Sequence, residues 1–88
     1  MTKIYIYCLF DGSDVFHGVY SSTQAVHRDA IKICNKNVGQ PLMEVNGKLD
    51  SPSLTKLRNL FKGAYDVQVR YFGANRLGAK IVKTKLKE

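Results

Sequence analysis

The chain has no tryptophan and only two cysteines and two prolines among its 88 residues. Cys8 and Cys34 are too few and too far apart for a zinc framework, and both lie in apolar segments, where a thiol behaves as a small hydrophobic group. We therefore expect reduced, buried cysteines, no metal site and no cofactor. The scarcity of proline, together with 44% hydrophobic residues, is typical of a folded chain rather than a disordered basic tail.

The chain also lacks a hydrophobic run long enough for a membrane span. The apolar segment 4–10 has seven residues and is followed by Asp11 and Gly12, whereas a transmembrane helix needs about 20 apolar residues. No signal-peptide cleavage pattern follows it. We expect a cytoplasmic protein without a membrane partner. Its length suits one small domain, residues 1–88, with a basic C-terminal half.

The sequence contains no motif of an active site. It has no glycine-rich phosphate loop, no nucleophile elbow and no metal-binding motif. The only material for acid–base chemistry is His17 and His27 together with Asp11, Asp14 and Asp29. A histidine near a basic surface could serve a small metal-independent ribonuclease as its general base, but the spacing fixes no such geometry. We predict a protein without catalytic residues and keep the ribonuclease as an alternative.

Acidic residues are scarce in the C-terminal part of the chain. From Pro52 onward two acids accompany nine Lys or Arg residues, whereas residues 1–51 carry five of each sign. The net charge of +7 is therefore concentrated in residues 52–88. This charge favours a polyanionic partner, because neutralising phosphates releases condensed counterions. The predicted nucleic-acid-binding residues are Lys56, Arg58, Lys62, Arg70, Arg76, Lys80, Lys83, Lys85 and Lys87.

Several interpretations of this charge stay open. RNA and DNA are not distinguished, because the electrostatic contribution treats their phosphates alike. A basic surface could instead dock on an acidic host enzyme, which would make the chain a protein-only inhibitor, or it could be a solvated surface with edge-strand lysines. Arg76 is the strongest individual candidate, since the glycine-flanked loop 73–78 can project it toward a phosphate.

Two strands and a helix are predicted in the N-terminal part. Segment 4–10 reads as a strand that ends at a turn over 11–14, and segment 15–20 returns as a second strand. Both faces of the first strand are apolar, so we expect a central strand covered on both sides. A capping box from Ser21 to Gln24 predicts a helix over 22–36. Its predicted core face consists of Val26, Ala30, Ile33 and Cys34.

A hairpin, a second helix and two more strands follow. Asn46-Gly47 predicts a type I′ turn between two short strands, and segment 50–52 predicts a helix start before a helix that ends at Gly63. Segment 65–72 alternates as a half-buried strand. The tail alternates again, with Ile81, Lys83, Lys85 and Lys87 on one side, and predicts a final strand that carries an exposed row of lysines.

The order ββα, hairpin, αββ predicts an α+β fold, a two-layer sandwich with two helices on one face of an antiparallel sheet. We expect Tyr5, Tyr7 and Leu9 to form an apolar surface on the face opposite the helices. Such a surface requires a partner, and a homodimer through the sheet is the preferred solution.

The N-terminal third resembles small accessory proteins of tailed bacteriophages. The resemblance rests on residues 3–7 (KIYIY), residues 18–22 (GVYSS) and the amphipathic helix that follows. Among such proteins, the basic balance is similar to that of the TifA-type RNA-binding inhibitors of toxin–antitoxin defence. The resemblance implies a non-enzymatic homodimer in the host cytoplasm, which binds RNA with little sequence preference and sequesters a host toxin or nuclease in a ribonucleoprotein assembly. It identifies no site residues.

Overall fold

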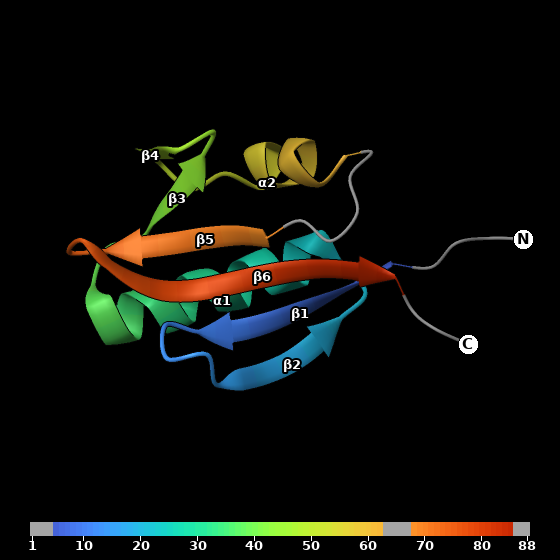
Figure 1. Cartoon of the computed structure of the whole chain (residues 1–88), viewed down its shortest axis with the longest axis horizontal. Coiled ribbons are helices and arrows are strands. Elements are labelled where there is room, and N and C mark those ends of the chain that lie inside the picture. Colours follow the sequence, from blue (N-terminus) through green and yellow to red (C-terminus); the bar gives the residue numbers. More distant parts are fainter. Residues whose placement is uncertain (1–4, 63–67, 86–88) are drawn as a thin grey trace, which may run out of the picture.

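The computed structural model describes residues 5–62 and 68–85, and within them the chain forms a six-stranded antiparallel sheet with two helices (Figure 1). The strand order is β2-β1-β6-β5-β3-β4. Helix α1 lies across one face of the sheet, and α2 lies beside α1 near β5. The predicted α+β two-layer sandwich is confirmed. The elements are β1 (Tyr5–Asp11), β2 (Phe16–Tyr20), α1 (Thr23–Val38), β3 (Leu42–Val45), β4 (Lys48–Asp50), α2 (Leu54–Phe61), β5 (Gln68–Gly73) and β6 (Arg76–Lys85).

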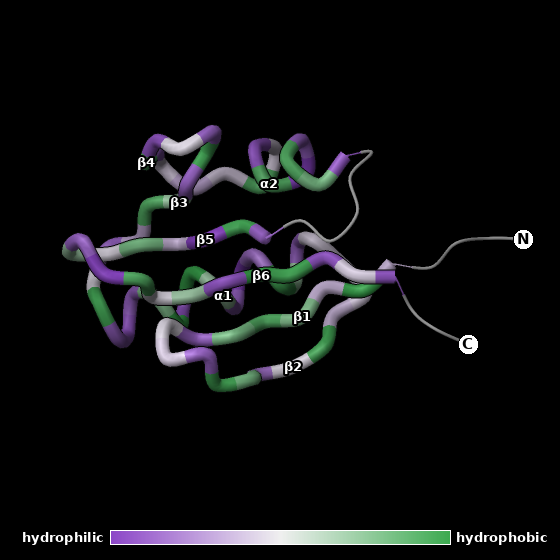
Figure 2. Tube along the Cα trace, viewed as in Figure 1, coloured by the Kyte–Doolittle hydropathy of each residue, from purple (hydrophilic) through white to green (hydrophobic). Residues whose placement is uncertain are grey.

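The hydrophobic core lies between the sheet and the two helices. Leu9 of β1 and Ile81 of β6 are opposite each other and fully buried, and Tyr71 of β5 is buried opposite Ala79 of β6. The hydrophobic colour runs almost unbroken along β1 and is interrupted by hydrophilic residues along β6 (Figure 2). The helices complete the core with Val26, Ala30 and Cys34 from α1 and Leu57 and Phe61 from α2.

The predicted face of the first strand was wrong. Leu9 is buried and the ring of Tyr7 lies 5.3 Å from that of Phe61, so the Tyr7–Leu9 side of β1 faces the helices. Cys8 and Phe10 therefore lie on the other face of the sheet, on which no described helix packs. A strand that is apolar on both sides gives no periodicity signal, so only the packing of the helices decides which side is covered.

We call this second surface the open sheet face. Cys8 pairs with Val19 of β2 on one side and with Val82 of β6 on the other, so the three side chains share this face. Phe10 and Phe16 add an edge-to-face ring contact with centroids 5.6 Å apart. Phe16 and Val19 are 54% and 55% exposed, which leaves an apolar area on the surface.

Both helix starts lie downstream of their predicted positions. Ser22, not Ser21, caps α1, because its extended backbone lets Oγ accept a hydrogen bond from the amide of Ala25 at 3.3 Å. In the same way Ser53 caps α2, and its Oγ accepts from the amide of Lys56 at 3.4 Å. Helix α1 runs two residues beyond its predicted end. The predicted stop of the second helix, Gly63, lies outside the described residues.

Two tight turns set the hairpins. Asn46 and Gly47 have positive φ of 51° and 82°, which confirms the predicted type I′ turn between β3 and β4. Ala74 and Asn75 adopt the same region, with φ of 51° and 62°, and join β5 to β6. The loop predicted over 73–78 is therefore a two-residue turn, and β6 begins at Arg76. Residues 65–67 of the predicted strand lie outside the described residues. In the described part of the chain, neither helix is long and apolar enough to cross a bilayer.

Candidate nucleic-acid interface

The basic side chains of the open sheet face are paired with carboxylates. Arg70 of β5 and Lys80 of β6 are opposite each other in the sheet. Arg70 Nη1 lies 3.2 Å from Glu44 Oε1, and Lys80 Nζ lies 2.8 Å from Asp14 Oδ1. Lys80 Nζ also lies 5.2 Å from the ring centroid of Phe10. Each cation is thus offset by a neighbouring anion, so this face is locally close to neutral.

The predicted exposed row of lysines on the last strand was wrong at Lys83, which is only 8% exposed. Lys83 is opposite Tyr7 in the sheet and therefore faces the helices. Its Nζ donates a hydrogen bond to the carbonyl oxygen of Phe61 at 2.7 Å. Carbonyls in the last turn of a helix lack intrahelical partners, and Lys83 satisfies one of them at the end of α2. Lys85 is exposed, and Lys87 lies outside the described residues.

The predicted basic residues of α2 have three different environments. Lys56 Nζ lies 2.9 Å from Asp50 Oδ2, and this contact lowers the pKa of the Asp50 carboxyl. Arg58 Nε donates to Thr23 Oγ1 at 3.1 Å and so links α2 to the first residue of α1. Lys62 is exposed just after the helix. Arg58 and Lys62 thus bring positive charge to the end of α2 that lies beside α1.

Arg76, the strongest individual candidate from the sequence, is exposed at the start of β6. It lies beside the β5–β6 turn, at the left end of the molecule in Figure 1, while the end of α2 lies toward the right. The longest dimension of the molecule is 43 Å. The structure therefore separates Arg76 from Arg58 and Lys62, and the eight predicted residues that it describes do not form one patch.

A row of basic residues on α1 was missed by the sequence analysis. Arg28, Lys32 and Lys36 are all exposed and recur every fourth residue, opposite the buried side of the helix. The rise of 1.5 Å per residue places successive members about 6 Å apart along the axis. Over residues 1–51 the charge of this row is cancelled by acidic residues elsewhere in the segment, so the net charge does not reveal it. The spacing of four residues between these basic side chains is the sequence signal that identifies the row.

One carboxylate lies beside this row. Arg28 Nε is 3.5 Å from Asp29 Oδ1, and Tyr20 donates from its hydroxyl to Asp29 Oδ2 at 2.6 Å. The hydrogen bond from Tyr20 lowers the pKa of Asp29 and keeps it ionised. Among the described residues, no carboxylate forms an ion pair with Lys32 or Lys36. We call Arg28, Lys32 and Lys36 of α1, with Arg58 and Lys62 at α2, the helical basic surface.

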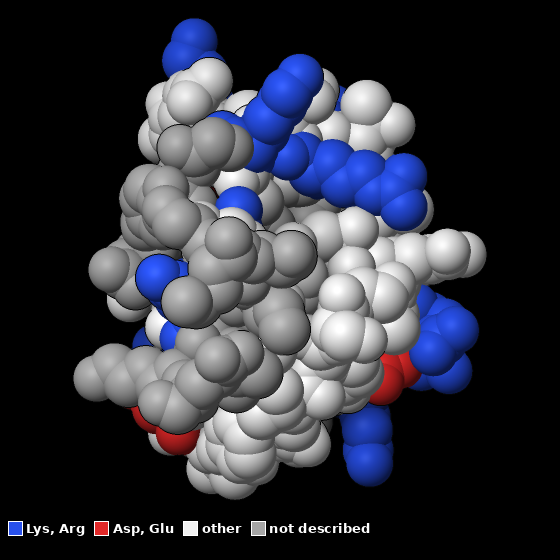
Figure 3. All heavy atoms as spheres, turned by 90° about the vertical axis from the view of Figure 1, so that its right-hand side faces the viewer, with Lys and Arg blue, Asp and Glu red and all other residues white. Residues whose placement is uncertain are grey.

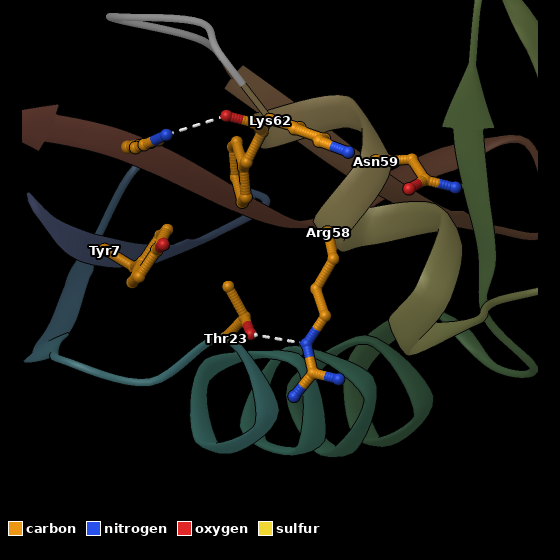
Figure 4. A pocket seen from close by; sticks show the side chains of 7 residues that line it. Tyr7, Thr23, Arg58, Asn59 and Lys62 are labelled. Atoms are coloured by element: carbon orange, nitrogen blue, oxygen red, sulfur yellow. Dashed lines mark hydrogen bonds between the residues drawn. The ribbon is translucent and has the colours of Figure 1, made fainter.

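An open pocket of about 350 Å³ lies where this surface reaches the sheet. Arg58, Asn59 and Lys62 line it from the end of α2. Figure 4 shows Arg58 extending toward Thr23 of α1, with Tyr7 of β1 across from it, while the side chains of Asn59 and Lys62 point away from Tyr7. The described residues that line the pocket are completed by Phe61 and Lys83. They include three cations and no carboxylate.

Figure 3 views this end of the molecule. Lys and Arg side chains extend from its upper and right-hand parts, while acidic atoms are visible only in its lower half. The described residues visible at this end therefore show more positive than negative charge.

The two histidines belong to separate networks. His17 Nε2 lies 3.2 Å from Asp11 Oδ2, and the pKa of Asp11 is lowered mainly by a hydrogen bond from the amide of Val15. His27 Nδ1 lies 2.6 Å from the buried hydroxyl of Tyr71, and burial lowers the pKa of His27. The described residues contain no group of three or more His, Cys, Asp or Glu side chains that could hold a metal ion.

Comparisons with protein-family models, with curated proteins and with solved structures returned no match for this chain.

Proposed function

We propose that this protein binds nucleic acid, in the first place single-stranded RNA, with little sequence preference and without catalysing a reaction. The observation that carries the proposal is the helical basic surface. Lys32, Lys36, Arg58 and Lys62 form no close ion pair with a carboxylate in the described structure, whereas Arg70 and Lys80 of the sheet do. Unpaired cations are the groups that gain most from contact with phosphates, because they release counterions without first breaking an ion pair.

The shape of this surface favours a flexible strand. Its residues lie on both helices, which meet where Arg58 donates to Thr23 at the start of α1, and the whole molecule measures only 43 × 24 × 18 Å. A DNA duplex stays nearly straight over about 500 Å, so it would contact one part of this surface at a time. A single RNA strand can bend to follow both helices, and Tyr7 at the pocket offers an aromatic ring for base contact.

Binding of this kind would have a simple consequence for an RNA-cleaving enzyme. RNA covered by a basic protein is withheld from a nuclease, and a nuclease that stays on the same RNA is held in the assembly. We therefore propose antagonism of a host toxin or defence nuclease as the biological role. The alternative is direct docking of the helical basic surface on an acidic host enzyme.

Fluorescence anisotropy with nuclease-treated protein tests RNA binding. Single-stranded RNA, duplex RNA and duplex DNA would be titrated at several salt concentrations, and we expect the tightest, steeply salt-dependent binding for single-stranded RNA. Lys32→Gln with Lys36→Gln should weaken binding and reduce the salt slope by about 1 for each lost phosphate contact. No binding of any nucleic acid at physiological salt would reject the proposal in favour of the protein-only inhibitor.

A matched control separates location from net charge. Arg70→Gln with Lys80→Gln removes the same two charges from the open sheet face, where both cations are paired with carboxylates. We expect this variant to bind RNA nearly as well as the natural chain. Equal losses in the two double variants would show that net charge alone, rather than the helical basic surface, governs binding.

We also propose that the open sheet face joins two copies of the chain. In a molecule of net charge +7, self-association needs a locally neutral contact. The paired cations Arg70 and Lys80, which share this face with the exposed apolar residues Phe16 and Val19, meet this requirement. Sedimentation equilibrium should find a dimer that Val19→Lys dissociates. A monomeric natural chain at high concentration would contradict it.

A further inference from the structure

Lys83 is a buried cation that takes part in none of the ion pairs of the described structure. Its Nζ donates to the carbonyl oxygen of Phe61 and lies 4.5 Å from the ring centroid of Tyr5. An ammonium group has three donors, and this carbonyl accepts from only one of them. Burying a charge is costly unless an opposite charge or several hydrogen bonds compensate. An anion beside Lys83 would supply that compensation.

The pocket adds two more cations to Lys83. Arg58 and Lys62 line it from the end of α2, and none of the described lining residues is acidic. Three positive charges around one pocket repel one another, and a bound anion would relieve that repulsion. Thr23 and Asn59 contribute polar groups to the same lining. Thr23 is also the first residue of α1, whose N-terminal end carries partial positive charge.

We propose that this pocket binds the phosphate of a nucleotide, between the buried Lys83 and the exposed Arg58 and Lys62. Its volume of about 350 Å³ is at the lower end of the range for ligand pockets, about 300–1,000 Å³, which suits one nucleotide rather than a helical segment. Tyr7 provides a ring for the nucleoside. The phosphate can come from two sources, the 5′-phosphorylated end of an RNA strand or a free nucleotide. The first source rests on the proposed function.

The first arm of the test uses a small ligand. Uridine 5′-monophosphate and uridine would be titrated into the isotope-labelled full chain, and amide chemical shifts followed by NMR. We expect the monophosphate to shift the amides of Thr23, Arg58 and Lys62, and uridine at the same concentration to leave them unchanged. Equal responses to the two compounds, or none, would overturn the pocket as a phosphate site.

Variants then test the cations. Lys62 is exposed. Lys62→Gln should lower the affinity for the monophosphate about tenfold, as expected for the loss of one charge-assisted hydrogen bond. Lys83→Met should abolish the response to the monophosphate. Because loss of its contact with Phe61 can unfold the protein, circular dichroism accompanies this variant and Lys62→Gln carries the test. Unchanged affinity in Lys62→Gln would remove that side chain from the site and contradict the proposal.

The second arm compares 5′-phosphorylated and 5′-hydroxyl RNA of one sequence. We expect the phosphorylated strand to bind at least about fivefold more tightly, and Arg58→Gln with Lys62→Gln to abolish the preference. Lys32→Gln with Lys36→Gln should lower both affinities and keep the preference. Tight RNA binding without a preference for the 5′-phosphate, together with no response to the monophosphate, would reject the pocket as a phosphate site. The proposed RNA binding would remain. A response to the monophosphate without RNA binding would support the pocket for a free nucleotide and reject the proposed function.

Discussion

The two faces of the sheet use the same residue types in opposite ways. On the covered face, Ile81 and Leu9 are fully buried and Lys83 reaches the end of α2. On the open sheet face, the neighbouring residues of the same strand, Lys80 and Val82, stay partly exposed, and Lys80 pairs with a carboxylate. The side of the sheet, rather than the residue type, decides whether a lysine of β6 acts as a surface charge or as part of the interior.

Core substitutions should show the largest difference between the two faces. Ile81→Ala removes a fully buried side chain and should lower the free energy of unfolding by about 2–5 kcal/mol. Val82→Ala, at the next residue of β6, should cost no more than about 1 kcal/mol, since it opens no enclosed cavity. Urea unfolding of both variants measures the difference. The comparison applies to the monomer, at concentrations below those at which the proposed dimer forms, and equal losses there would contradict the difference between the two faces.

Glycine substitutions should show the next largest effect. A Cβ at Gly78 would lie 2.5 Å from Cys34 Sγ and 2.6 Å from Val38 Cγ2, so α1 could not keep its present distance from β6. We expect Gly78→Ala to cost about 1–3 kcal/mol through overpacking. Gly18→Ala in β2 is the control, because its nearest neighbour would lie 3.5 Å away. Thermal unfolding of the two variants should therefore give a clearly lower midpoint only for Gly78→Ala.

The covered face should also make stability depend on pH. Burial lowers the pKa of His27 below its ordinary value of 6.5. As the pH falls, the imidazole is therefore protonated in the unfolded chain before it is protonated in the folded chain. Stability is therefore complete above about pH 6.5 and falls as the pH drops below it. Urea unfolding at pH 7 and pH 5.5 should show this loss in the natural chain and a smaller one in His27→Gln. The same loss in both proteins would assign it to other groups.

Ion pairs of the open sheet face should show the smallest effect. Arg70→Ala breaks the exposed contact with Glu44 and should change the free energy of unfolding by no more than about 1 kcal/mol. The change should shrink further in high salt, because exposed pairs are screened. Chemical unfolding at two salt concentrations measures it. Under the same monomeric conditions, a loss of several kcal/mol would contradict the exposed position of this ion pair.

Much of the fold could be predicted from the sequence because its signals are local. Val26, Ala30 and Cys34 recur at helical spacing and form the buried side of α1, and Asn46-Gly47 forms the turn that its composition predicts. Both helix starts were predicted upstream of their observed positions, because neighbouring polar residues offer alternative caps. The turn at Ala74-Asn75 was missed because alanine is not typical of positive φ.

The site was harder to predict than the fold because it depends on which residues become neighbours. Arg70, Lys80 and Lys83 are all basic residues in the sequence. In the structure the first two contact carboxylates, and the third contacts a helix carbonyl. The pocket joins Tyr7 and Thr23 to α2 across more than 30 residues of chain. No local pattern carries that information.

The sequence by itself determined the composition of the core, the alternation of strands and helices and the net charge, because these depend on residue type and short-range spacing. Only the tertiary structure decided which face of β1 is covered, which lysine of β6 is buried and which cations keep their charge unpaired. These outcomes depend on the register between β1 and β6 and on the position of α2, which long-range packing sets.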